Sequence, residues 1–360
     1  MKEPGAGALG PRLGLALAAT VAALALCELF ARLFLPWSPP SMIRFGELRV
    51  VAEGAGIAGQ VDTVFERDPE VFWRLRPNSS LPPGGPLFGT IANRQGLREL
   101  REIAEVKPDR EIRILFLGDS TTFGWGLAAD QTQALLTEAA LRKRFPDTSV
   151  LCINAGVPGY TLFQGWKVLA TRGLGFEPDL VVASFGFNDQ ETWGGRGDLE
   201  VYEHLRRAEP PASLAWSRVA RLFQTALFPL PEVGSPKRAR LTPVEFRELL
   251  VKLRETTSEA EIDLLLLVGG LRINVDGSHP PSHRSDYQRE QYRFATSHAF
   301  GPRGRDAQLD AVPLMQRLAA SHRTQEIFLD HVHPTLLANR VVADALAERI
   351  APWLQTRLRY

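Results

Sequence analysis

The segment 111–190 alternates between short, continuous apolar runs and helical stretches, and this alternation constrains the fold more than any other feature of the chain. Three runs have the length and apolar continuity of strands that are buried on both faces: 112–117, 150–154 and 180–185. Residues with helical spacing separate these runs, over 131–145 and 162–174. Strands that alternate with helices form a parallel sheet with helices on both faces. We therefore expect a three-layer α/β/α fold.

Looser elements follow over 191–360. Thr242, Pro243 and Glu245 form a helix start signal, because they supply the N-cap, a proline in the first turn and a capping-box glutamate. The other expected elements are, in order, a helix at 211–227, a strand at 262–268, a polar loop region with one helix at 272–305, a last strand at 327–329 and a helix opened by Pro334.

Length and composition set further limits. The chain has 360 residues, of which 44% are hydrophobic and 23% charged, and its formal net charge is +1. These values exclude a disordered chain, and the near-neutral charge offers no general basic footprint for nucleic acid. Two cysteines, Cys27 and Cys152, are too few for a disulfide framework. We divide the chain into an anchor at 1–37, a Pro- and Gly-rich lead-in with short strands at 38–110, and a main domain at 111–360 with insertions at about 191–260 and 272–305.

The N-terminal segment has the length and composition of a membrane-spanning helix. Residues 13–27 are uncharged and rich in Leu and Ala, and the apolar character continues to residue 35. The 23 residues of 13–35 would span about 35 Å as a helix, which is enough to cross a bilayer core of about 30 Å.

The charges near this segment bear on its orientation. Glu28 and Arg32 are four residues apart, so they can pair on one face of the helix. Lys2 and Arg12 precede the apolar run, which favours an N-terminus inside and the rest of the chain outside the cytoplasm, in the periplasm or at the cell surface.

Three other interpretations of the segment compete with an anchor. Residues 23–25, Ala-Leu-Ala, fit the small-x-small pattern of a cleaved signal peptide, but the apolar run continues about ten residues beyond them. A lipoprotein site at Cys27 is disfavoured because the preceding Leu26 is bulky. A buried core helix is disfavoured because Pro36 and two further prolines follow at once. An uncleaved anchor is therefore our prediction.

Polar residues gather where the expected strands end. Ser120 follows the first strand in Gly-Asp-Ser, Gly159 follows the second, and Asn188 follows the third in Gly-Phe-Asn-Asp. Asp330 and His333 follow the last in Asp-His-Val-His-Pro. Ligands of open α/β sheets bind at the carboxyl ends of the strands. A serine, a base and a carboxylate at this edge, together with backbone and amide donors for an oxyanion, indicate nucleophilic catalysis.

These four blocks, in this order, resemble those of the SGNH (GDSL-type) hydrolase family, with a lead-in similar to that of its membrane-anchored bacterial members. The resemblance implies a flavodoxin-like parallel sheet. It also implies Ser120 as nucleophile, His333 as base and Asp330 as its partner. The oxyanion hole would comprise the N–H groups of Ser120 and Gly159 and the side chain of Asn188. The Gly-x-Ser-x-Gly elbow of other α/β hydrolases is absent.

The sequence leaves alternatives at several positions. Ser120 could serve only as a helix N-cap. Gly156 rivals Gly159 as a donor. His331 rivals His333, although only His333 combines the three-residue spacing from Asp330 with a following proline.

The sequence also contains residues whose functional role is less specific. Asp189 is expected to tie its loop, and Cys152 to be buried in its strand. Phe123, Trp125 and Trp193 either line a substrate groove or pack in the core. His279 and His283 have the four-residue spacing of zinc ligands on a helix, but two prolines lie between them. We expect no metal and no cofactor.

The sequence therefore predicts a serine esterase that cleaves carboxylic esters, with small acyl groups on cell-envelope carbohydrate as the favoured substrate. An O-acyltransferase would use the same residues, and a non-catalytic accessory protein of envelope assembly would keep the fold without the reaction. The expected partners are an acyl ester and a membrane but no nucleic acid, and the oligomeric state is left open.

Overall fold

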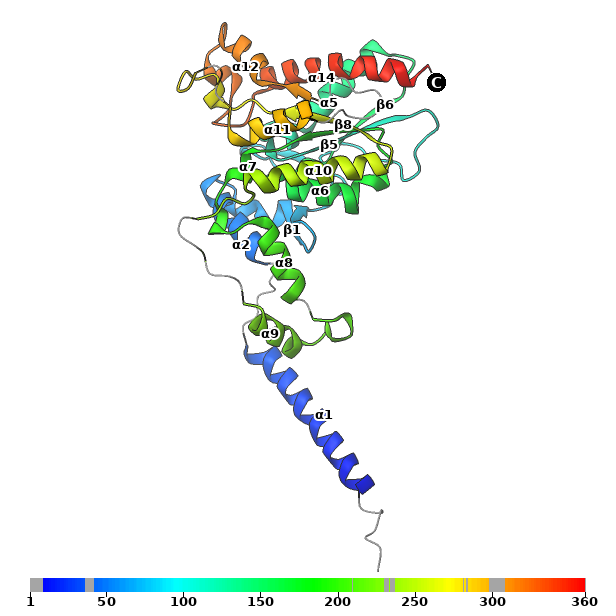
Figure 1. Cartoon of the computed structure of the whole chain (residues 1–360), viewed down its shortest axis with the longest axis vertical. Coiled ribbons are helices and arrows are strands. Elements are labelled where there is room, and N and C mark those ends of the chain that lie inside the picture. The colour runs from blue at the N-terminus through cyan, green and yellow to red at the C-terminus, as the bar shows by residue number, and fades with distance from the viewer. Residues whose placement is uncertain are drawn as a thin grey trace, which may run out of the picture. The chain divides into compact units, whose positions relative to one another are not determined.

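A computed structural model describes residues 9–35, 42–208, 210–229, 233, 237–280, 282, 284–297 and 308–359 (Figure 1). The chain divides into two compact units. The smaller comprises residues 1–43 and 200–232, and the larger comprises 44–199 and 233–360. Each is described by itself.

The larger unit is built on one parallel sheet of five strands in the order β6-β5-β7-β8-β9. The strands are β5 (Ile112–Gly118), β6 (Val150–Asn154), β7 (Leu180–Ser184), β8 (Asp263–Val268) and β9 (Gln308–Asp310). All residues of β6 and β7 are buried, as are six of the seven in β5. This burial explains why the three strands read as unbroken apolar runs.

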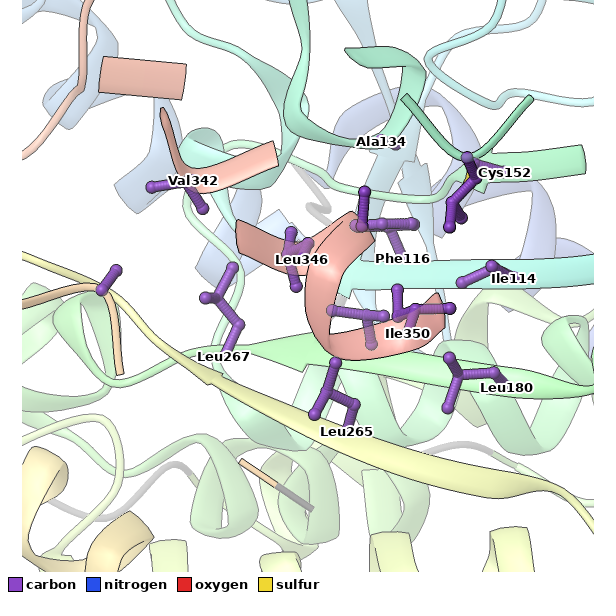
Figure 2. Close-up of a cluster of buried hydrophobic side chains, with 14 of the residues drawn as sticks. Ile114, Phe116, Ala134, Cys152, Leu180, Leu265, Leu267, Val342, Leu346 and Ile350 are labelled. Atoms are coloured by element: carbon purple, nitrogen blue, oxygen red, sulfur yellow. The ribbon is translucent and has the colours of Figure 1, made fainter. Parts of the chain in front are cut away.

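Helices cover both faces of the sheet, so the three-layer prediction is confirmed. On one face lie α5 (Gln133–Arg144) and α14 (Leu336–Arg357); on the other lie α6 (Leu162–Thr171), α10 (Pro243–Glu259) and α11 (Asp286–Ser297) (Figure 1). Figure 2 shows Val342, Leu346 and Ile350 of α14 packed among side chains of β5 and β8.

The helix start at Thr242 is also confirmed. The Thr242 hydroxyl accepts the N–H of Glu245, and the Glu245 carboxylate accepts the N–H of Thr242. The expected helix at 211–227 begins later, as α9 (Arg218–Leu227), because Ser217 caps it; residues 212–214 form only a 3-10 turn.

The predicted last strand at 327–329 is wrong. Residues Thr324–Ile327 form the short helix α13, and Phe328 makes only an isolated bridge to Pro334. The fifth strand is β9, whose three residues, Gln-Leu-Asp, are only partly buried at the edge of the sheet and carry no apolar run. Ile327 and Phe328 belong to the core cluster and are apolar for that reason. Their short apolar run has the same sequence pattern as a buried strand.

The lead-in contains short strands, as expected, and these form two antiparallel pairs. Its elements are α2 (Met42–Gly54), η1 (Ala58–Gln60), α3 (Val61–Val64), β1 (Phe65–Asp68), β2 (Phe72–Leu75), β3 (Ser79–Leu81) and β4 (Gly89–Ala92). Trp73 is fully buried and donates from its indole to the carbonyl of Pro158 at 3.1 Å. Its own carbonyl accepts the Tyr160 hydroxyl at 2.5 Å. The lead-in thus packs against the loop that follows β6.

The smaller unit contains α1 (Leu9–Phe34), η5 (Ala212–Leu214) and α9. Residues Leu13–Phe34 are long and apolar enough to be a membrane anchor or a signal sequence. The expected pair on this helix is present, with Arg32 Nε donating to Glu28 at 2.7 Å. The helix α8 (Asp198–Ala208) runs from one unit into the other. The remaining elements are α4 (Ser120–Phe123), η2 (Ala129–Gln131), η3 (Gly173–Phe176), α7 (Phe187–Gln190), η4 (Trp193–Gly195), η6 (Arg272–Asn274) and α12 (Val312–Ala319).

Candidate active site

Ser120 lies at the carboxyl end of β5 as the first residue of α4. The N-cap is Asp119 rather than Ser120: its carboxylate accepts the N–H of Thr121 at 2.8 Å. The turn is too tight for a side chain at Gly118, where a Cβ atom would lie 1.9 Å from the Thr122 hydroxyl oxygen. The Ser120 hydroxyl is therefore left over for another partner.

That partner is His333, which connects Ser120 to Asp330. His333 Nε2 lies 2.7 Å from Ser120 Oγ, and His333 Nδ1 lies 2.6 Å from Asp330 Oδ2. The other oxygen of Asp330 accepts the backbone N–H groups of Val332 and His333, each at 2.8 Å. Trp125 stacks on the imidazole, with ring centroids 5.3 Å apart and planes 18° from parallel.

Asp330 is held as a carboxylate. Burial alone would raise its pKa, but the hydrogen bonds from the His333 ring and from the two backbone N–H groups outweigh burial, and the pKa lies below the ordinary 3.8. An ionised Asp330 places the Nδ1 proton of His333 and leaves Nε2 as the acceptor that faces Ser120.

His331 does not reach the serine. Its ring packs against Phe187, with centroids 5.3 Å apart, and its carbonyl accepts the N–H of Arg272. Of the two rival histidines, His333 alone forms the link between Ser120 and a carboxylate.

The structure also distinguishes the backbone N–H groups of Ser120 and Gly159 from that of Gly156. Among the described residues, neither the N–H of Ser120 nor that of Gly159 has a hydrogen-bond acceptor, and both residues line one cavity. The N–H of Gly156 is already bonded to Asn154 Oδ1 at 3.0 Å. A Cβ atom on Gly156 would lie 2.5 Å from the Phe123 nitrogen, so this glycine serves the close approach of the loop to α4.

Asn188, on α7, lines the same cavity. Its amide nitrogen lies 3.2 Å both from Asp119 Oδ2 and from the carbonyl of Tyr160. Both distances are at the long end of the N–H···O range. These two acceptors orient the amide beside Ser120.

The conformation at Gly159 depends on residues that sequence reasoning missed. Gly159 has a φ of 81°, and a Cβ atom there would lie 2.9 Å from Trp193 and 3.1 Å from Trp73. Its carbonyl accepts Arg240 Nη1 at 2.6 Å, and the Arg240 guanidinium lies 4.5 Å from the Trp193 ring centroid. No local pattern around Arg240 signals this role, because Gly159 is 81 residues away.

A buried ion-pair network holds Arg240 in place. Its guanidinium bonds both oxygens of Asp198, at 3.1 and 2.9 Å, and Arg44 lies 2.9 Å from the same carboxylate. Burial disfavours the charge on Asp198, but Arg240 and Arg44 outweigh it, and the pKa of Asp198 is lowered. Arg44 also donates to the carbonyl of Trp193 at 2.8 Å.

The cavity beside Ser120 has a volume of about 410 Å³. One wall carries the polar residues described above, together with Trp125 and Trp193. The lead-in contributes an apolar wall: Leu48, Val51, Ala52, Ala55, Ile57 and Phe65. Of the three aromatic residues that the sequence left open, Trp125 and Trp193 line the cavity. Phe123 is buried, with the Arg98 guanidinium 4.3 Å from its ring centroid.

Residues 116–341 match the model of the GDSL-like lipase/acylhydrolase family. The chain belongs to this family. The match covers the stretch from β5 to the C-terminal helix, and it makes this chain an ester-hydrolysing enzyme.

Solved structures resemble parts of this GDSL-like hydrolase at low identity. An α/β hydrolase from the metagenome of Lake Arreo, Spain, is 19% identical, over 69% of this chain and 97% of that chain, with a TM-score of 0.45. An acetylxylan esterase from Geobacillus stearothermophilus is 16% identical, over 66% and 94%, with a TM-score of 0.46. The acetyl xylan esterase AlAXEase is 16% identical, over 66% and 98%, with a TM-score of 0.45. No curated protein matches the chain significantly.

The sequence predicted that Asp189 ties its loop and that Cys152 is buried in its strand. Asp189 is buried and accepts the N–H groups of Leu162 and Gly186, each at 2.8 Å, while burial raises its pKa to about 7. Cys152 is buried in β6. His283 lies outside the described residues, within which no group of three metal-binding side chains occurs.

Proposed function

We propose that this GDSL-like hydrolase is a serine esterase in which Ser120 is the nucleophile. His333 takes the Ser120 proton as the hydroxyl oxygen attacks the ester carbonyl, and Asp330 orients and stabilises the resulting imidazolium. The single observation that carries the proposal is the unbroken link from Ser120 through His333 to Asp330, at 2.7 and 2.6 Å.

The tetrahedral intermediate requires donors for its oxyanion. The unoccupied N–H groups of Ser120 and Gly159 border the same cavity, as does Asn188. The Asn188 amide donates to Asp119 and to the Tyr160 carbonyl, each at 3.2 Å, and would redirect one of these two long bonds to the oxyanion. Each such donor contributes about 2.7–4 kcal/mol to the stability of the transition state. Collapse of the intermediate expels the alcohol with the proton from His333, and water then attacks the acyl-enzyme by the same route.

The proposed substrates are carboxylic esters of small acyl groups, with acylated carbohydrate of the cell envelope as the favoured class. The apolar wall contributed by Val51, Ala52 and Ile57 supports an apolar acyl group in the cavity. The proposed organisation is an anchor at 1–37 with the lead-in and the catalytic domain outside the cytoplasm. Two features support it: the apolar helix and the basic residues before it.

The test is hydrolysis of p-nitrophenyl acetate by the full chain in detergent micelles, beside Ser120→Ala and His333→Ala. The matched control is His331→Ala, which removes the neighbouring imidazole that packs on Phe187. We expect both site variants to lose at least 10³-fold in kcat and the control to keep its rate within a few-fold. Equal rates in all four proteins would refute the assignment.

Two further outcomes are distinguishable. Faster release of p-nitrophenol with formation of an acylated sugar when a carbohydrate acceptor is added would identify an O-acyltransferase that uses the same site. No reaction with the ester, and no labelling of Ser120 by a serine-directed phosphonate in folded protein, would identify a non-catalytic accessory protein.

A further inference from the structure

The helix α9 of the smaller unit is strongly two-sided. Its apolar residues follow the i, i+3, i+4, i+7, i+8 pattern of one helix face: Val219, Leu222, Phe223, Ala226 and Leu227. The other face carries Arg221, Gln224 and Thr225. Phe223 is 64% exposed and Leu227 55% exposed. Large apolar side chains also stand exposed in the flanking turns: Leu214, Trp216 and Phe228.

Glu28 and Arg32, the charged pair of α1, attach α9 to that helix. Glu28 accepts the backbone N–H groups of Arg218 and Val219, at 2.8 and 3.1 Å, and the hydroxyl of Ser217 at 2.9 Å. Glu28 therefore caps the N-terminus of α9, whose unpaired N–H groups would otherwise need another partner.

The basic partner of Glu28 completes the attachment. Arg32 donates to the carbonyl of Trp216 at 2.8 Å, and Arg218 donates to the carbonyl of Leu35 at 2.6 Å. Two charges that are unusual inside an apolar helix thus have a structural purpose: they fix α9 against the C-terminal third of α1. Apolar residues of both helices then line a groove of about 730 Å³.

The position of Glu28 along α1 indicates its depth in a bilayer. Fifteen residues separate it from Leu13, the first residue of the span, which corresponds to about 22 Å of helix. A hydrocarbon core of about 30 Å then places Glu28 and the start of α9 roughly 8 Å inside the outer boundary. Amphipathic helices that lie in the interface bury their apolar face by about 5–10 Å.

We propose that α9 is an interfacial membrane helix, whose apolar face enters the outer boundary of the bilayer that α1 spans. The occupant of the groove between the two helices is a lipid acyl chain. This inference rests on α1 as a membrane span and not on the reaction at Ser120. The exposed aromatic residue Trp216, beside the helix start, fits the headgroup level.

The test measures the depth of single positions in the full chain, reconstituted in bilayer discs of phosphatidylcholine and phosphatidylglycerol. Cys27→Ser and Cys152→Ala give a background into which Leu24→Cys, Phe223→Cys or Thr225→Cys is introduced. A fluorophore on each cysteine is quenched by lipids that carry a spin label at carbon 5 or at carbon 12 of the acyl chain. A circular dichroism spectrum and a melting temperature that match those of the background protein show that the labelled proteins are folded.

We expect the label at Phe223 to be quenched several-fold more by the shallow spin label than by the deep one, and the label at Leu24 to show the reverse. The matched control at Thr225, on the polar face, should be quenched several-fold less than Phe223 by both. Glu28→Gln should weaken quenching at Phe223 without changing that at Leu24.

Three results would overturn the proposal. Quenching at Leu24 with none at Phe223 would place α9 outside the bilayer. Equal quenching at Phe223 and Thr225 would remove the two-sided orientation. Crosslinking of Phe223→Cys between two chains, without quenching, would make a second copy the occupant.

Discussion

Arg240→Met tests how the backbone at Gly159, the proposed oxyanion donor, is held. Arg240 is fully buried, and its guanidinium donates hydrogen bonds to three residues: Asp198, Gln164 and, at its carbonyl, Gly159. Methionine is unbranched and can follow much of the arginine stem between the two tryptophan rings. The substitution therefore removes the guanidinium while keeping much of the apolar packing.

The expected loss of stability follows from the contacts. The cluster of Arg44, Arg240, Glu47 and Asp198 has no net charge, and without Arg240 it becomes a buried net negative charge. Removing one partner of a buried ion pair costs about 3–5 kcal/mol. Arg44 and the Thr161 hydroxyl, at 2.9 and 2.7 Å from Asp198, remain and place the loss at the lower end of this range.

The activity should fall as well, because the Gly159–Tyr160 peptide loses the donor that fixes its carbonyl, and the adjoining Pro158–Gly159 peptide, which carries the Gly159 N–H, can then shift. If the N–H then leaves its position, the loss approaches that of one oxyanion donor, roughly 10²–10³ in kcat. The change should appear in kcat more than in KM, since the donor bonds the oxyanion rather than the ester.

Two assays on the full chain in detergent check these values. The first is the urea concentration at the midpoint of unfolding. The second is kcat for p-nitrophenyl acetate without urea, at a temperature at which the variant is folded. Arg289→Met is the matched control, because Arg289 makes an exposed pair with Asp286 whose loss costs at most about 1 kcal/mol. The reasoning is refuted if Arg240→Met unfolds at the same urea concentration as the control with an unchanged kcat.

Three further predictions concern the same unit. Asp330→Asn should make the free energy of unfolding depend less on pH at acid pH. The pKa of Asp330 in the folded state lies below 3.8, so its carboxylate stabilises the native state above about pH 4, and this contribution disappears as the pH falls through the folded value. Urea midpoints of the variant and the unaltered protein between pH 3 and pH 6 measure the difference. Gly156→Ala should lower stability by about 1–3 kcal/mol, since its methyl would press on the Phe123 nitrogen at 2.5 Å; an unshifted melting temperature would contradict this. Val51→Trp, at the half-exposed rim of the apolar wall, should reduce kcat/KM for p-nitrophenyl butyrate several-fold more than for the acetate, and an equal effect on both esters would exclude that wall from acyl binding.

The central strands and helices were predictable because their signals are local. A strand buried on both faces must be apolar throughout, and β5, β6 and β7 all appear within a residue or two of their predicted bounds. The candidate site residues could also be selected from the sequence as a group. Each lies in a short motif. Ser120, Gly159 and Asn188 come after β5, β6 and β7, whose ends the parallel sheet brings to one edge, whereas Asp330 and His333 come after the short helix α13.

The supporting residues could not be predicted in the same way. Arg240 stands in a basic stretch of a linker, and nothing in its neighbours connects it to Gly159. Its importance arises only when the chain brings them together at 2.6 Å. The edge strand β9 was not predicted because its local signal is weak. It is short and half-buried, so it lacks the apolar run of an interior strand.

Residues of the lead-in support the loop that carries Gly159. Its α2 contributes Arg44, which shares Asp198 with Arg240, while Arg240 bonds the carbonyl of Gly159. Its β2 contributes Trp73, which leaves Gly159 no room for a side chain. A segment that resembles a linker between anchor and enzyme therefore forms part of the catalytic unit. In the proposed mechanism the motif residues supply the reacting groups, and Trp73 of the lead-in, whose indole donates to the carbonyl of Pro158, fixes the peptide whose N–H would meet the developing oxyanion.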